Sequence, residues 1–287
     1  MQTVNDNYPK GNAELTDEQL KELALQNMNR DEVRNTGFPT ETITLPSQGK
    51  VYPAENPLAS GQIEMKYMTA REEDILTSPN LIKQGVVLDK LMQSLIVSNV
   101  KYDDIVIGDK NAIMIAARIL GYGKQYNFEI TCPSCSTKNK VSVDLTKLEE
   151  KHLSEDLVQT SPGVFKFILP NSNREVEFKF LTSGDEKAIQ KELEFLKKTN
   201  TKDSINRELS TRLKRMIVSV DGNYDRNYIS SFVQNELFAI DSRALRSYIK
   251  ESGPDMKFQF NFNCTECGHE EEALALPMGV SFFWPDA

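Results

Sequence analysis

The sequence predicts an α+β protein built from two copies of one strand-helix-β-hairpin unit, with the copies joined by a shared four-cysteine zinc site. Three observations support this prediction. Alternating strand patterns and helix start signals are both present, without the regular strand-helix alternation of a doubly wound sheet. Landmarks of the first half recur in the same order in the second half. Two Cys-x-x-Cys pairs stand at matching places in the two halves.

Length and composition define the class of protein. The chain has 287 residues, of which 39% are hydrophobic and 26% are charged, so it is long enough for about two domains and too apolar to be wholly disordered. Peptide hormones and disulfide-stapled miniproteins are therefore excluded. The formal net charge is −8, the wrong sign for a protein whose main task is to neutralise phosphates. Composition thus disfavours nucleic acid as a partner.

Neither secretion nor membrane insertion is predicted. The N-terminal region contains no long apolar run, and the longest uninterrupted apolar stretch, residues 112–117, is far shorter than the ~20 residues that cross a bilayer. Four cysteines in Cys-x-x-Cys pairs, without a signal peptide, indicate metal ligands in a reducing compartment. We expect synthesis in the cytoplasm.

The order of segments divides the chain into five parts. They are an N-terminal arm (1–37), a first repeat (38–146), a connector (147–174), a second repeat (175–277) and an aromatic C-terminal tail (278–287). In the arm, residues 16–19 have the spacing of a capping box ahead of a short amphipathic helix that includes Leu20 and Leu23. Two interpretations stay open for this helix, namely packing on the chain's own core or a tether that orders on a partner.

The first copy is predicted from its N-terminal end. Residues 37–61 carry four prolines and three glycines, which indicates extended segments joined by turns. Residues 63–69 alternate apolar and polar side chains, the period of a strand, and residues 71–76 have the acidic start of a helix. The glycines of 121–125 lack the spacing of a P-loop and predict a helix end.

The second half repeats these landmarks. Ile63–Thr69 matches Val176–Thr182 residue type by residue type, and Leu95–Ser98 matches Met216–Ser219. The two landmarks are further apart in the second half, and the extra residues fall in a charged helix around 197–205, which we predict to be longer in the second copy. A shared order of landmarks indicates a duplicated unit.

Each copy is predicted to continue with a capped helix and to end in a β-hairpin. Asp109 and Asp241 occupy matching positions, and each is expected to cap the helix that follows it. The predicted hairpin arms are residues 126–131 with 140–145 and residues 257–263 with 271–276.

The connector is predicted to hold a short helix over residues 148–156 and a turn at 161–163. Residues 165–170 and 174–180 then have the pattern of a hairpin that opens the second copy.

The two Cys-x-x-Cys pairs predict one structural zinc ion per chain. The proposed ligands, two from each hairpin turn, are Cys132, Cys135, Cys264 and Cys267. A redox motif and disulfides are alternatives, but a redox Cys-x-x-Cys normally begins a helix, whereas the flanks here are strands. His269 is an alternative ligand in the second turn. Four thiolates leave no open coordination position, so we do not expect a catalytic metal.

No catalytic residues are predicted. The chain has two histidines, and it lacks a nucleophile elbow, a zinc-protease motif and a dinucleotide fingerprint. We therefore expect neither enzyme activity nor a small-molecule substrate. Residues 197–215 hold seven basic and two acidic side chains, which indicates a solvated helix face or a contact for an acidic partner or nucleic acid.

The C-terminal tail contains three consecutive aromatic residues, Phe282, Phe283 and Trp284. Chain ends are usually polar, so these side chains are expected to be buried somewhere. They dock either on the chain's own core or in the pocket of a partner, where aromatic residues act as anchors.

Several segments together resemble the baseplate hub proteins of T-even-like contractile-tailed bacteriophages. They are residues 45–52, 61–69 and 71–76, the Cys-Pro-x-Cys hairpin and the tail at 282–285. The resemblance extends from Phe38 to the C terminus. It implies a structural virion protein, a subunit of the tail baseplate hub or of hub assembly, that contacts other baseplate or tail proteins and is made in the host cytoplasm. The alternative is a zinc-hairpin adaptor that binds nucleic acid or the transcription machinery through Arg207–Arg215.

Overall fold

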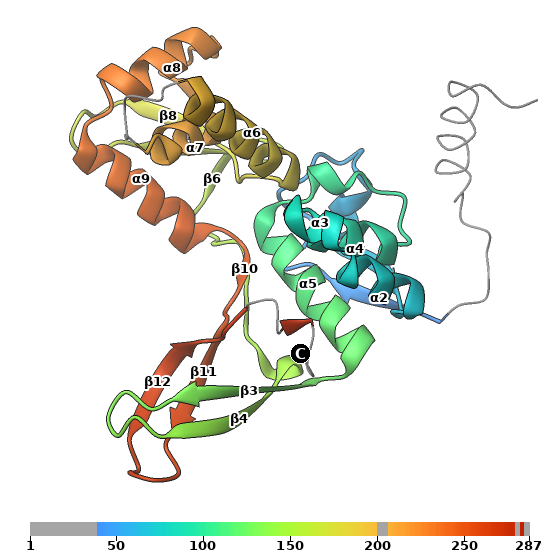
Figure 1. Ribbon diagram of the computed structural model, residues 1–287. Coiled ribbons are helices and arrows are strands. Elements are labelled where there is room, and N and C mark those ends of the chain that lie inside the picture. Colours follow the sequence, from blue (N-terminus) through green and yellow to red (C-terminus); the bar gives the residue numbers. More distant parts are fainter. Residues whose placement is uncertain (1–38, 200–205, 279–281, 284–287) are drawn as a thin grey trace, which may run out of the picture. The chain divides into compact units, whose positions relative to one another are not determined.

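The computed structural model describes residues 39–199, 206–278 and 282–283. Helices and strands are both present, which confirms the mixed class predicted from the sequence. The elements of the first half (Figure 1) are β1 (Thr40–Thr44), η1 (Pro57–Ser60), β2 (Gln62–Lys66), α2 (Ala70–Thr77), α3 (Pro79–Lys83), α4 (Val87–Leu95), η2 (Tyr102–Asp104), α5 (Ile107–Tyr122), β3 (Gln125–Thr131), β4 (Lys138–Asp144) and η3 (Leu145–Lys147).

The elements of the second half follow a similar order. They are β5 (Glu150–Lys151), β6 (Val158–Ser161), β7 (Val164–Ile168), β8 (Glu175–Phe178), α6 (Ser183–Thr199), α7 (Glu208–Met216), β9 (Ile217–Val220), α8 (Arg226–Asn235), α9 (Ala239–Ser252), β10 (Asp255–Met256), β11 (Gln259–Asn263) and β12 (Glu270–Ala275).

The first half packs helices against the antiparallel hairpin of β1 and β2. Side chains alternate between the two faces of a strand, so Ile63 and Met65 of β2 point into the core. Helix α4 buries Leu91 and Leu95, which lie one helical turn apart and therefore share one face of the helix. Helix α5 ends at Tyr122, and Gly123 follows with φ of 80°, which confirms the predicted helix end.

The second half contains a four-stranded antiparallel sheet in the order β6-β7-β8-β9. Strands β7 and β8 are the hairpin predicted to open the second copy. The rings of Phe165 and Phe178, one from each of these strands, lie 5.8 Å apart, and Phe232 of α8 is also buried. The core of this half therefore lies between the sheet and its helices.

The connector differs from the prediction because a distant segment decides its conformation. Residues 148–156 do not form a helix; η3 is followed by β5, which pairs with β10. The backbone of Lys257 also donates a hydrogen bond to the carbonyl of Glu149 (2.9 Å). Local helix propensity is weak compared with such tertiary pairing. The described part of the segment 37–61, residues 39–61, includes extended structure and turns as predicted, with β1 as its strand.

Asp109 and Asp241 do not cap their helices as predicted. The capping residues are Val106 and Phe238, and each aspartate is the third residue of its helix, α5 or α9. Both carboxylates are buried and accept hydrogen bonds from the loop of the hairpin that precedes the helix. They therefore join helix to hairpin instead of closing the helix end.

The two carboxylates have similar partners. Asp109 accepts from the backbone and hydroxyl of Ser47 (2.9 and 2.6 Å) and from the hydroxyl of Tyr52 (2.7 Å). Asp241 accepts from the backbone N–H groups of Asn171 and Ser172 (2.7 and 3.1 Å). In both halves the donor loop begins with a buried leucine followed by a proline, in the sequences Leu-Pro-Ser and Leu-Pro-Asn.

The end of the chain docks on the first half. Phe282 and Phe283 are both 1% exposed, and their rings are 5.1 Å apart. The ring of Phe282 meets Tyr126 edge to face at 5.0 Å, and its carbonyl accepts a hydrogen bond from the buried Arg118 (2.7 Å). The Tyr126 hydroxyl donates to the carbonyl of Pro277 (2.9 Å).

These contacts favour the first of the two alternatives predicted for Phe282 and Phe283, which is docking on the chain's own core. Both rings are part of that core. The other residues for which partner contacts were predicted, Leu20, Leu23 and Trp284, lie outside the described residues.

Replacing Phe282 by alanine is expected to lower the free energy of unfolding by about 3–5 kcal/mol, because it removes a fully buried ring and leaves a cavity. Urea denaturation followed by circular dichroism measures this loss. The matched control is Phe195→Ala, whose ring is 67% exposed and whose removal should change stability little. Equal stability of the two variants would contradict the core role of the tail.

Candidate metal centre

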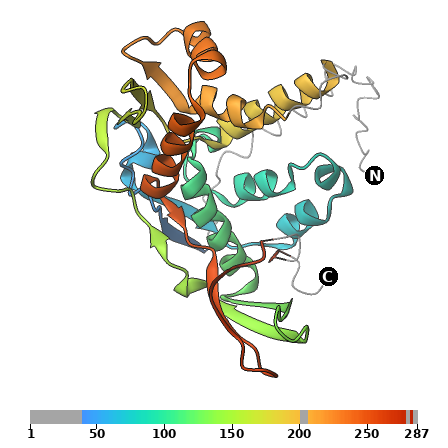
Figure 2. The same ribbon diagram turned by 90° about the vertical axis from the view of Figure 1, so that its left-hand side faces the viewer.

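The two hairpins that carry the cysteines lie side by side (Figures 1 and 2). Strands β3 and β4 pair without interruption, whereas β11 and β12 pair around an irregularity between Phe260 and Phe262. Phe128 of β3 and Phe260 of β11 stand at matching positions in the two hairpins, and their rings meet edge to face at 5.2 Å. This aromatic contact joins the hairpins above their turns.

The two turns have the same backbone structure. In the first, the N–H of Cys132 donates to the carbonyl of Thr137 (2.9 Å), and the N–H of Ser136 donates to the carbonyl of Cys132 (2.9 Å). In the second turn, the N–H of Cys264 donates to the carbonyl of His269 (2.8 Å), and the N–H of Gly268 donates to the carbonyl of Cys264 (3.0 Å). The residue that needs a positive φ is Ser136 in one turn (60°) and a glycine in the other (69°).

These turns bring the four sulfur atoms together. All four lie within 4.8 Å of one another; between the hairpins, the sulfurs of Cys132 and Cys267 are 3.8 Å apart and those of Cys135 and Cys264 are 3.6 Å apart. Four sulfur ligands placed tetrahedrally at ~2.3 Å from a zinc ion would be about 3.8 Å apart. The arrangement therefore fits a tetrahedral thiolate site.

The cysteine cluster is distinguished by how close together its metal-binding atoms lie. Across residues 39–199, 206–278 and 282–283, it is the one set of three or more His, Cys, Asp or Glu side chains close enough to share a metal ion. Cys132 and Cys264 are buried, and Cys135 and Cys267 reach the surface. All four are free thiols, not disulfides.

The environment favours a thiolate at Cys264. Backbone N–H groups of Cys267 and Glu266 face its sulfur and lower the pKa of Cys264 to about 6, against the opposing effect of burial. At Cys267 a backbone hydrogen bond from His269 lowers the pKa, but the neighbouring Cys135 thiol, burial and the other thiols outweigh it and raise the pKa of Cys267 to about 11. A bound cation would relieve this crowding of like charges.

Asn139 was not recognised as a site residue from the sequence. It is a buried residue of β4, and its amide nitrogen lies 3.5 Å from the Cys264 sulfur. Its carbonyl oxygen accepts hydrogen bonds from the backbone and hydroxyl of Thr265 in the other turn (3.0 Å each). Asn139 therefore ties the two turns together through side-chain contacts. An alternating polar residue in a strand gives no sequence signal for this role.

His269 contributes its backbone, not its ring, to the second turn. Its Nε2 atom lies 3.9 Å from a carboxylate oxygen of Glu271, and His269 is not part of the cysteine cluster. The structure therefore gives the imidazole no role as a ligand.

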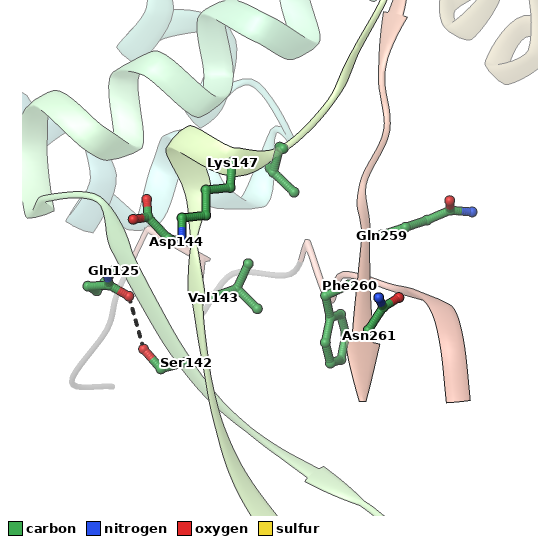
Figure 3. Close-up of a pocket in the computed structure, with 9 residues that line it drawn as sticks. Gln125, Ser142, Val143, Asp144, Lys147, Gln259, Phe260 and Asn261 are labelled. Carbon is green, nitrogen blue, oxygen red and sulfur yellow. Dashed lines mark hydrogen bonds between the residues drawn. The ribbon is translucent and has the colours of Figure 1, made fainter. Parts of the chain in front are cut away.

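A cavity of about 550 Å³ lies beside the hairpins, between β4 and β11 (Figure 3). Its lining is mainly polar and includes Gln125, which accepts a hydrogen bond from Ser142 (3.1 Å), together with Asp144 and Lys147. This lining contains no histidine, cysteine or paired carboxylates.

The positive charge of the basic segment, residues 197–215, is partly neutralised by acidic side chains of the same chain. Arg212 pairs with Glu186 and Glu208, and Arg215 lies 3.9 Å from Glu192. Residues 200–205 of this segment lie outside the described residues.

In the part of the chain that the structure describes, no helix is long and apolar enough to cross a membrane.

Comparison with known protein families identifies the family of the chain. Residues 39–284, most of the chain, match the family described as "T4 bacteriophage base plate protein". No curated protein and no solved structure matches the chain.

The purified full chain is expected to bind one zinc ion, and native mass spectrometry before and after chelation measures the count. Replacing Cys132 and Cys264 together by serine should abolish binding, because it removes one ligand from each hairpin. The matched control His269→Ala should keep the ion, since the ring is not part of the cluster. Two ions per chain, none, or loss of the ion in the control would contradict a single shared site.

Proposed function

Because the chain belongs to the T4 bacteriophage base plate protein family, we propose that it is a component of the baseplate hub that acts through contacts with other tail proteins. At the coarser level it is a structural protein of a T4-like phage baseplate, and a component of the virion tail. The single observation that carries the proposal is this family membership. The chain's own features are compatible with it, since the described residues present a packed core and a thiol cluster.

We further propose that the chain is a duplicated unit, and hydrogen bonds at matching positions support this. In the first half, Glu72 accepts from Lys66 (2.9 Å) and from the backbone and hydroxyl of Thr69 (3.0 and 2.5 Å). In the second half, Asp185 accepts from the matching lysine (2.6 Å) and from the backbone and hydroxyl of the matching threonine (3.1 and 3.3 Å). One alignment of the two halves, without a gap, relates all three positions.

Strand pairing also supports the proposed match between the two halves. Met65 of β2 forms an antiparallel bridge with Ile96, and Phe178 of β8 pairs with Ile217 of β9. The sequence landmarks match Met65 with Phe178 and Ile96 with Ile217, so the two bridges join equivalent residues. The two halves thus have in common a hairpin, a helical crossover, a return segment that pairs with the hairpin, a long helix and a cysteine hairpin.

In this proposal zinc fastens the two copies to each other. Each copy supplies two thiolates, so the ion closes a link between segments that are far apart in the sequence. A structural zinc ion contributes ~10–16 kcal/mol of apparent binding free energy, which is enough to hold two small hairpins in one arrangement. The metal would then act on shape and stability, and protein contacts would supply the function.

The alternative of a nucleic-acid adaptor gains no support from the described residues. The arginines of α7 pair with glutamates of the same half, and the chain as a whole is acidic. A basic surface free to contact phosphates is the feature that such an adaptor would need.

Phage that encode the Cys132→Ser, Cys264→Ser double variant are expected to assemble few or no infectious particles, because the two copies separate. Phage that encode His269→Ala should assemble normally. Plaque counts and mass spectrometry of purified tails measure the effect. Normal yield of the double variant would contradict a structural role for the metal.

The hub assignment is tested separately by labelling. A small tag on this chain, located by electron microscopy of isolated baseplates, should lie at the centre of the baseplate. A peripheral label would contradict the hub assignment and leave membership of the baseplate intact.

A further inference from the structure

The two halves contact each other through a short backbone bridge. Val106, just before α5, pairs with Thr182, just before α6. The N–H of Ile107 donates to the carbonyl of Leu181 (3.0 Å), and the N–H of Ser183 donates to the carbonyl of Ile105 (2.8 Å). All of these side chains except those of Ile107 and Thr182 are buried, so the bridge joins an apolar face of the first half to a segment of the second.

The same apolar face exists in the second half but is uncovered there. The alignment that pairs Asp109 with Asp241 also pairs Val106 with Phe238. Val106 is 4% exposed, whereas Phe238 is 57% exposed. Ile240, two residues further along the chain, is also exposed, at 61%. We call these two residues, Phe238 and Ile240, the open face.

The segment that would cover such a face also exists in a second version. The alignment that pairs Thr69 with Thr182 matches residues 181–183 with Met68, Thr69 and Ala70. Leu181 and Ser183 are buried, whereas Thr69 and Ala70 are exposed and Met68 is half-buried against the core of its own half. We call residues 68–70 the open segment.

Backbone groups at both places are available for the same bridge. Ile107 and Ser183 are the first residues of their helices, and their N–H groups bond across the contact between the halves. Ala239 and Ala70 are the matching first residues of α9 and α2. Among the described residues, neither of their N–H groups has a hydrogen-bond partner.

We propose that the open face of one molecule binds the open segment of a second copy of this chain, through the bridge that the two halves form within one molecule. The occupant is a second copy because the segment that fits this face is part of the chain itself. The inference rests on the duplicated architecture proposed above. Because the two surfaces differ, the contact is head to tail. A row of molecules joined in this way has a free open face at one end and a free open segment at the other, so further molecules can add.

The contact between molecules differs from the internal one in two respects. Ile240 stands where the first half has Gly108, whose missing side chain lets the carbonyl of Pro254 approach, so this close approach is not repeated. The ion pair of Lys187 with Asp103 (2.6 Å) is not repeated either, because the matching residues are an aspartate and an asparagine. The proposed contact is therefore apolar with backbone hydrogen bonds, and added salt should weaken it little.

The test is the mass of the full, zinc-loaded chain in solution, measured by sedimentation velocity over a range of concentrations. We expect the wild-type protein to form dimers and larger species as concentration rises. Phe238→Asp should remain at the mass of one chain, 32.6 kDa, because it places a charge in the open face. Ala70→Asp should also remain monomeric, because it places a charge in the open segment.

Both substitutions are compatible with folding. Aspartate is a preferred capping residue, and Phe238 is the capping residue of α9. An acidic residue in the first turn of α2, where Ala70 stands, is also favourable. The control Phe195→Asp changes a ring of 67% exposure that belongs to neither the open face nor the open segment, and it should associate like the wild type.

An equal mixture of the two variants gives the decisive result. Phe238→Asp keeps an intact open segment and Ala70→Asp keeps an intact open face, so the mixture should form a dimer with one chain of each kind and nothing larger. A monomeric wild type, association of either variant alone, or a mixture that remains monomeric would overturn the inference. A monomeric chain that still enters phage tails would overturn it while leaving the proposed function intact.

Discussion

A buried carboxylate near the start of α5 and another near the start of α9 connect these helices to the hairpins that precede them, and the arrangement of each half depends on these contacts. Asp109 and Asp241 sit where backbone N–H groups at a helix N-terminus favour negative charge, and each also accepts hydrogen bonds from the preceding hairpin loop. Burial raises the pKa of Asp109, and the hydroxyl and backbone of Ser47 act in the opposite direction. Loop, helix and the cysteine hairpin after the helix therefore form one connected unit in each half.

The thiol cluster depends on this connection. A two-stranded hairpin alone is marginally stable in water, and each cysteine hairpin has only two strands. The first cysteine hairpin follows the C-terminal end of α5, and the second follows the short segment after α9. The positions of these two helices therefore determine where the two turns meet. The Phe128–Phe260 contact and the amide of Asn139 then bring the turns into register, and the metal proposed for the cluster would complete the link.

The sequence predicts features that depend on local pattern and misses those that depend on distant partners. Strand alternation located β2 and β8, and the helix end at Gly123 followed from its backbone freedom. The helix expected over 148–156 is wrong because β10, which lies far along the chain after α9, pairs with this segment. At the site, spacing identified the four cysteines, whereas Asn139 has no local signal because its partners lie in the other hairpin.

The identity of the residue before α9 bears on how the molecule meets its neighbours. A helix capping position favours Asp, Asn, Ser or Thr, because their side chains bond the first free N–H groups. Phe238 does not supply such a bond and exposes a large ring, which does nothing for the stability of an isolated chain. Val106, at the same position in the first half, is equally unsuited to capping, but there the second half covers it. An apolar residue is therefore suited to this position when another segment covers it, and at Phe238 the second copy proposed above would supply that segment.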